Sequence, residues 1–200
     1  MSTTTAEVGL RERKKAATRQ ALHQAAVRLA LAHGADKITV EAVADEAGVS
    51  RRTFSNYFAN KEEALLYGDH VRISVLIGMV QARPAGERPW EALTEAAREF
   101  YRQLGELDPA WVAQTRLVRS HPALLAQQLN TFAAVERELA AAVTARMDEP
   151  DPAGVRAQLA AATFMASLRV ALRIWLDAPA GRSLGDLVDR ALAEAGRGFA

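Results

Sequence analysis

Residues 40–61, VEAVADEAGVSRRTFSNYFANK, decide the fold because they predict two short helices joined by a tight turn. Gly48 stands after the first helix, where a residue without a Cβ most easily adopts the left-handed backbone that ends a helix. Thr39 and Ser50 precede the two helices, and their hydroxyl groups are typical N-caps. The pattern indicates a helix-turn-helix, whose second helix presents its first side chains to the DNA major groove.

The side chains at the start of the second helix suit DNA recognition. Arg51 and Arg52 are adjacent there, and a two-pronged contact between arginine and guanine is worth about 1–3 kcal/mol of discrimination. Thr53 could donate to a phosphate or touch a thymine methyl group. Lys61 begins the following helix, where its charge and the free backbone N–H groups favour a phosphate. The alternative interpretation is an ordinary helical hairpin inside a bundle.

Charge is distributed unevenly along the chain, although the net charge is only +1. Residues 1–61 contain four more basic than acidic side chains, whereas the remainder has an acidic excess of three. This bias favours a DNA-facing module joined to a part with another task. Near the N-terminus, the side chains that would lie along the DNA backbone or in the minor groove, or else form a solvated basic tail, are Arg13, Lys14, Lys15 and Arg19.

The whole chain is predicted to be helical, because apolar residues recur at three- and four-residue spacing and no stretch alternates like a strand. We therefore expect an all-α fold of about nine helices. Residues 1–60 would form an N-terminal arm and a three-helix DNA-binding domain, and residues 61–200 a larger ligand-binding and dimerisation bundle. Helices are expected at residues 10–33, 40–47, 51–57, 60–83, 90–107 and 110–120, between 122 and 148, and at 153–177 and 184–199.

Composition argues against several classes of protein. Cysteine is absent, which excludes disulfides, thiolate catalysis and cysteine zinc sites. The four histidines are scattered and there is no HExxH motif, so neither a metal nor another cofactor is expected. Without a nucleophile–base pair or a glycine-rich phosphate loop, the chain is not expected to be an enzyme. No apolar run approaches the roughly 18 residues of a membrane span, so a soluble cytoplasmic protein without a membrane partner is expected.

Residues 39–65, with Gly48, Val49, Ser50, Thr53, Tyr57, Phe58 and Lys61 at matching positions, resemble the DNA-binding domain of the tetracycline-repressor (TetR/AcrR) family. The resemblance implies an Ω-shaped, all-helical homodimeric repressor with its dimer contact on the last two helices. Such a repressor binds a palindromic operator on double-stranded DNA and releases it when a small-molecule effector binds the C-terminal domain. The alternative is a helical small-molecule-binding protein or an enzyme without operator binding.

The resemblance also implies which side chains face DNA. One position departs from the family pattern, since Ser55 stands where most members have a tyrosine that contacts phosphate. That contact is expected to be absent or to be replaced by a neighbouring side chain. The candidate DNA-binding residues are Thr39, Ser50, Arg51, Arg52, Thr53, Asn56, Tyr57 and Lys61.

The C-terminal part carries weaker indications of a ligand. Residues 111–129 are similar to family members whose ligand is an acyl-CoA or a related acyl compound. An arginine in this stretch would meet a ligand carboxylate or phosphate, or else lie at the surface in an ion pair. Aromatic side chains would line an apolar cavity, or else belong to the core. The candidate ligand-binding residues are Phe100, Tyr101, Trp111, Arg116, Arg119, Phe132, Phe164 and Trp175.

Overall fold

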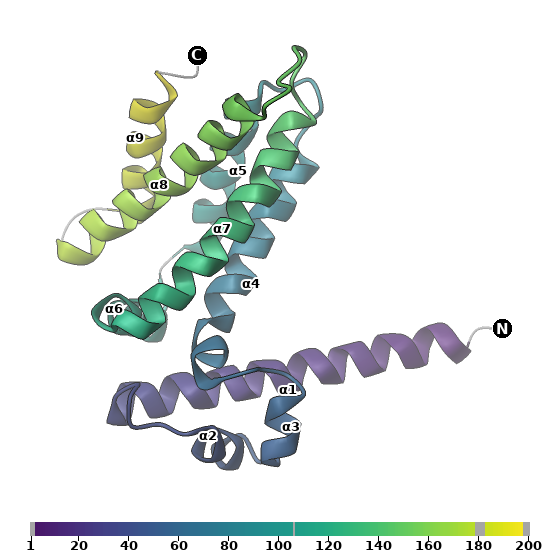
Figure 1. Cartoon of the computed structure of the whole chain (residues 1–200), viewed down its shortest axis with the longest axis vertical. Coiled ribbons are helices and arrows are strands. Elements are labelled where there is room, and N and C mark those ends of the chain that lie inside the picture. The colour runs from purple at the N-terminus through teal and green to yellow at the C-terminus, as the bar shows by residue number, and fades with distance from the viewer. Residues whose placement is uncertain (1–2, 106, 179–182, 198–200) are drawn as a thin grey trace. The chain divides into compact units, whose positions relative to one another are not determined.

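Nine α-helices and no strand make up the secondary structure of the described residues, which are 3–105, 107–178 and 183–197 of a computed structural model (Figure 1). The expected all-α fold is confirmed. In chain order the helices are α1 (Thr3–His33), α2 (Val40–Glu46), α3 (Arg51–Ser55), α4 (Lys61–Ala82), α5 (Pro89–Leu104), α6 (Pro109–Ser120), α7 (Pro122–Thr144), α8 (Val155–Asp177) and α9 (Leu184–Gly196).

The expected helix boundaries agree closely with the structure, with a few local differences. α1 begins at Thr3 rather than Leu10, and α3 and α5 end two and three residues earlier than expected. α8 begins at Val155 rather than Ala153, because Gly154 adopts a left-handed φ of 65°. The Asp151 carboxylate then accepts the first N–H groups of that helix at 3.1 Å.

The helices form two compact units, and these do not divide at residue 60. The first unit contains residues 1–71 together with 113–128, and the second contains 72–112 together with 129–200. The end of α6 and the start of α7 therefore fold with the predicted DNA-binding helices, although more than 40 residues separate them in the chain. The expected functional division into residues 1–60 and 61–200 stays a prediction.

In the first unit, α1, α2, α3 and the start of α4 enclose one hydrophobic core. α2 and α3 lie together against one side of α1, and the first half of α1 projects beyond them (Figure 1). Leu22 of α1, Val43 of α2 and Phe54 of α3 are almost fully buried in this core. Val118 of α6 and Leu124 of α7 complete this core from the distant segment, residues 113–128.

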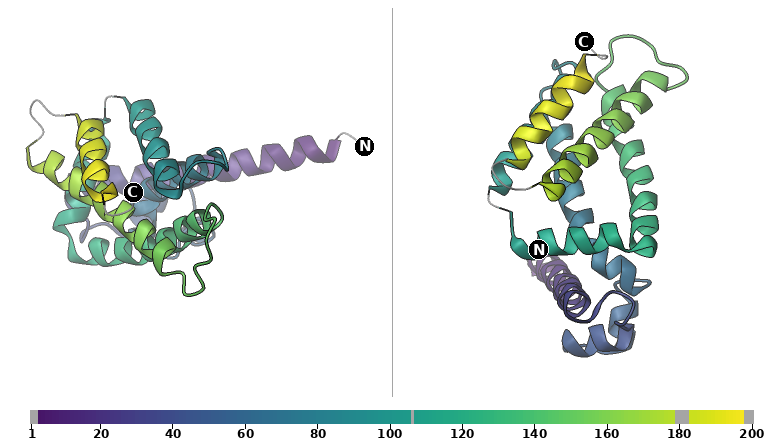
Figure 2. Two further views of the ribbon diagram at one scale, coloured as in Figure 1. Left: turned by 90° about the horizontal axis from the view of Figure 1, so that it is seen from above. Right: turned by 90° about the vertical axis from the view of Figure 1, so that its left-hand side faces the viewer.

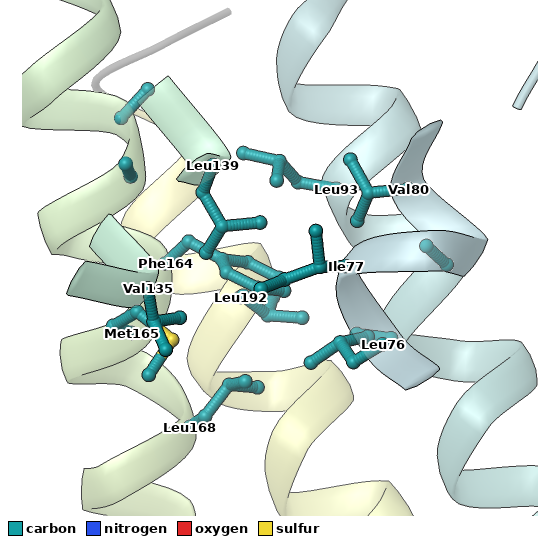
Figure 3. Close-up of a cluster of buried hydrophobic side chains, with 14 of the residues drawn as sticks. Leu76, Ile77, Val80, Leu93, Val135, Leu139, Phe164, Met165, Leu168 and Leu192 are labelled. Carbon is teal, nitrogen blue, oxygen red and sulfur yellow. The ribbon is translucent and has the colours of Figure 1, made fainter. Parts of the chain in front are cut away.

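The core of the second unit is built from α4, α5, α7, α8 and α9. Figure 3 shows apolar side chains from all five helices converging, and α8 and α9 lie side by side (Figure 2). Close packing of α8 is possible because several of its core positions are alanine. The side chains labelled in Figure 3 are Leu76, Ile77, Val80, Leu93, Val135, Leu139, Phe164, Met165, Leu168 and Leu192.

α8 is both long and apolar. Among the described residues, this is the one helix whose length and composition would suffice to cross a membrane. Nearly half of it is buried inside the protein, where Ala157, Ala161 and Phe164 are in the core. The core helix of a globular bundle is buried in the same way. Packing against the core therefore explains why one face of α8 is apolar.

Candidate nucleic-acid interface

The turn between α2 and α3 has the geometry that its sequence predicts. The Thr39 hydroxyl accepts the backbone N–H of Ala42 at 3.1 Å, which caps α2. The Ser50 hydroxyl accepts the N–H of Thr53 at 3.1 Å, which caps α3. Gly48 between them has a left-handed φ of 68°. Both predicted N-caps are confirmed, and together they fix the angle at which α3 begins.

The first turn of α3 presents its polar side chains outward. Arg51 and Arg52 are exposed, and an ion pair of 3.0 Å joins the Nη1 atom of Arg51 to Glu41 of α2. The Thr53 hydroxyl is half-buried and lies 2.9 Å from that of Ser50. Phe54 points the other way, into the core. One face of this short helix therefore holds the fold while the opposite face is available to a partner.

The later candidates on and after α3 differ in their surroundings. Asn56 is exposed and forms the C-cap of α3, and Ser55 beside it is exposed as well. Tyr57 is half-buried, and its carbonyl oxygen accepts a bond of 3.4 Å from Arg19 of α1. The structure thus places Asn56 on the open surface and ties the backbone of Tyr57 to α1.

Arg19 belongs to the structure of the unit rather than to a solvated basic tail. Its guanidinium lies 5.7–5.8 Å from the ring centres of Tyr57, Phe58 and Tyr67, within the range of cation–π attraction. It therefore braces α1 against the end of α3 and the start of α4. Lys14 and Lys15, by contrast, are exposed on the projecting half of α1.

Lys61 has a role that the sequence did not reveal. Its ammonium group donates to the carbonyl oxygens of Ala35, Asp36 and Ile38 at 2.9, 3.2 and 3.0 Å. An ammonium has three N–H donors, so the loop between α1 and α2 engages all of them. The predicted contact between Lys61 and a DNA phosphate would require it to give up one of these bonds.

The start of α4 is capped by two reciprocal side-chain hydrogen bonds. The Asn60 side chain accepts the N–H of Glu63 at 2.7 Å, and the Glu63 carboxylate accepts the N–H of Ala59 at 2.7 Å. This reciprocal arrangement is close to a capping box, shifted by one residue at its second bond. It holds the junction between α3 and α4 in place.

Two polar residues of the distant segment hold the first unit together. Gln114 of α6 is buried and donates to the carbonyl oxygen of Leu65 at 2.7 Å. His121, between α6 and α7, lies 2.8 Å from the carboxylate of Asp36 in the loop that Lys61 also holds. Sequence reasoning missed both contacts. The only signal was a polar Gln114 on the face of α6 that also carries Val118.

The predicted ligand-binding aromatic residues lie in the second unit. Phe100 and Phe164 are buried in its core. Tyr101 is half-buried with its ring edge-on to Phe100, and burial raises the pKa of Tyr101 to about 12, so its hydroxyl stays neutral. The remaining aromatic candidates, which pack at the margin of this core, are Trp111, Phe132 and Trp175.

Arg116 and Arg119, the two charged ligand-binding candidates, are on α6. Both are exposed, and their part of α6 belongs to the first unit. The helix turns its buried face, with Gln114 and Val118, toward that unit's core. That one of these arginines meets a ligand carboxylate or phosphate stays a prediction.

Two hollows in the second unit differ in size and lining. A hollow of about 130 Å³ lies beside Trp111, between Leu104, Leu107 and Arg72, whose guanidinium is 5.1 Å from the centre of the Trp111 ring. A larger cleft of about 400 Å³ lies where the loops before α5 and before α8 meet, and it is lined in part by charged side chains. Among the described residues, no three His, Asp or Glu side chains are grouped to hold a metal ion.

Comparison with known proteins gives consistent matches over most of the chain. Residues 22–67 match the family described as "Bacterial regulatory proteins, tetR family", and residues 87–200 match the "MftR C-terminal domain" of the same family. The HTH-type transcriptional regulator TcmR of Streptomyces glaucescens is 35% identical over 173 residues, covering 84% of this chain and 76% of that protein.

Solved structures show the same fold at low identity. SmeT of Stenotrophomonas maltophilia, in complex with triclosan, has a TM-score of 0.65 at 19% identity over 91% of both chains. Thermus thermophilus FadR, in complex with lauroyl-CoA, has a TM-score of 0.59 at 21% identity over 91% of this chain and 95% of that one. With a family match over more than half of its length and a regulator 35% identical to it, the chain belongs to the TetR family of bacterial transcriptional regulators.

Proposed function

We propose that the chain is one protomer of a homodimeric cytoplasmic repressor that binds a palindromic operator and releases it when an apolar or amphipathic small molecule binds. One observation carries the DNA part of this proposal: α3 is capped at Ser50, buries Phe54 and exposes Arg51 and Arg52 from its first turn. Such a helix can enter the major groove with two arginines leading. As a member of a family of regulators, the chain is not an enzyme.

Dimerisation through α8 and α9 is supported by the outer face of α8. Val155, Leu159, Val170 and Ile174 are between 38% and 54% exposed. Their spacing of four, eleven and four residues places them along one side of the helix. Because large exposed apolar faces mark association sites, a second copy of the chain would cover this stripe.

The effector is proposed to bind the second unit among its half-buried aromatic side chains. Trp111 and Phe132 lie at the margin of an apolar core and are accompanied by Arg72 and Arg169, whose guanidinium groups stack on their rings at 5.1 and 5.4 Å. A ligand with an apolar body and an anionic end would find both kinds of contact there. The similar structures contain triclosan in one case and lauroyl-CoA in the other, which fits this class.

The DNA part is tested by fluorescence anisotropy on a duplex that the full chain selects from a random pool. Arg51→Ala should weaken binding by roughly ten-fold, the cost of losing an arginine–base contact, and Arg52→Ala should also weaken it, through a lost contact with a base or a phosphate. Arg137→Ala is the matched control, because it removes an exposed arginine from α7. Equal binding by all three variants and the wild type would overturn the proposal, and so would an operator complex that lauroyl-CoA and other acyl or aromatic compounds all leave intact.

A further inference from the structure

Glu41 and Arg51 form a bridge across the helix-turn-helix. Glu41 is the second residue of α2 and Arg51 the first residue of α3, and a carboxylate oxygen lies 3.0 Å from the Nη1 atom. The side chain of Glu41 is 52% exposed and that of Arg51 is 72% exposed. Surface ion pairs of this kind add little to folding stability. The position of the Glu41–Arg51 ion pair is therefore more informative than its strength.

The bridge holds one of the two leading arginines and not the other. A guanidinium has five N–H donors in a fixed plane, so a carboxylate at Nη1 leaves other donors for the paired acceptors of guanine. Arg52 is exposed and, within the described residues, has no such acidic partner. Successive helical residues point about 100° apart, so Glu41 orients Arg51 alone.

A second ion pair in the same unit shows what is particular about Glu41. Glu46, at the other end of α2, accepts two bonds from Arg28 of α1 at 3.0 and 3.1 Å. Both glutamates are exposed, both are on α2 and both bind an arginine. Only the Glu41 pair involves a residue in the first turn of α3.

We propose that Glu41 is a positioning residue for operator recognition. Glu41 holds the plane of the Arg51 guanidinium so that the free donors of Arg51 meet a base edge. The negative charge of Glu41 disfavours other placements of the helix on DNA, in which a phosphate would approach it. Arg51 then reads a base while Arg52, which no acidic side chain among the described residues orients, serves the backbone. This inference rests on the proposed DNA-binding function and adds a source of sequence specificity to it.

The test compares Glu41→Gln with Glu46→Gln, each of which removes one negative charge from α2. Affinity is measured for the selected duplex and for a scrambled duplex of equal length and composition. Both variants should bind the scrambled duplex more tightly than the wild type, because each lowers repulsion from phosphates. Only Glu41→Gln should lower the ratio of specific to scrambled binding, by about two- to five-fold, the value of an exposed ion pair.

A double-mutant cycle separates positioning from a general effect of charge. With Arg51→Ala already present, adding Glu41→Gln should leave the ratio unchanged, because there is no guanidinium left to orient. The inference fails if Glu41→Gln lowers the ratio no more than Glu46→Gln, or lowers it equally without Arg51. A wild-type chain that does not distinguish the two duplexes would instead overturn the proposed function itself.

Discussion

At the scale of single residues, Lys61 shows how one side chain can hold the loop that precedes the predicted DNA-binding helices. Its three donors hold the carbonyl groups of Ala35, Asp36 and Ile38, which form the loop between α1 and α2. That loop leads directly to the cap at Thr39. The orientation of α2, and through Gly48 that of α3, therefore depends on an ammonium group at the start of α4.

Lys61→Met should destabilise the chain by about 2 kcal/mol, because it leaves backbone carbonyls without a charged donor. The free energy of unfolding in urea measures this loss, and weaker operator binding should accompany it. Lys37→Met is the matched control, since it removes an exposed lysine from the same loop. If both variants unfolded at the same urea concentration, the bracing role of Lys61 would be wrong.

At the scale of elements, α8 combines two kinds of packing on one helix. Alanines 157, 160, 161 and 171 are buried within the chain's own core. These small side chains allow α8 to pack closely within its own unit. The apolar residues left for a partner are instead the larger Val155, Leu159, Val170 and Ile174.

Leu159→Arg should therefore convert the proposed dimer into a monomer without unfolding it. A charge on a stripe of about half-exposed apolar residues cannot be covered by an identical stripe. Light scattering coupled to size-exclusion chromatography gives the mass directly. Leu31→Arg, at a comparably exposed leucine of α1, should leave the mass unchanged. A Leu159→Arg chain that keeps the wild-type mass would place the contact elsewhere.

At the scale of the whole molecule, the chain passes twice through its first unit. Residues 1–71 enter it first, and residues 113–128 return to it after the chain has begun the second unit. Gln114 and Leu124 are buried there, 59 and 69 residues after the end of α3. The segment that carries the predicted recognition helix is thus stabilised by residues that no local pattern connects to it.

Leu124→Ala tests this dependence, with its neighbour Leu125 as the control. Leu124 is 1% exposed in the core of the first unit, whereas Leu125 is 39% exposed. Removing the buried side chain should cost about 2–5 kcal/mol and reduce hydrogen-exchange protection of α1, α2 and α3. Leu125→Ala should cost much less. Unchanged protection in Leu124→Ala would show that α1–α3 are stable without the returning segment.

The helices and their caps were predictable because they depend on residues close together in the chain. Thr39, Gly48 and Ser50 set the helix-turn-helix through bonds that reach three residues or fewer, and hydrophobic spacing predicts the other helices. The family resemblance in residues 39–65 added DNA as the expected partner, and the family match over residues 22–67 includes this stretch.

The sequence by itself determined an all-α chain with a helix-turn-helix, because short-range hydrogen bonds and periodic burial are local properties. Tertiary structure alone decided what the polar side chains do, because ion pairs and buried hydrogen bonds join residues that are distant in the chain. Lys61 donates to carbonyl oxygens that precede it by 23 to 26 residues, and Gln114 donates to the carbonyl oxygen of Leu65. Arg116 and Arg119 lie on the exposed face of α6, since packing of Val118 turns that helix toward the first unit.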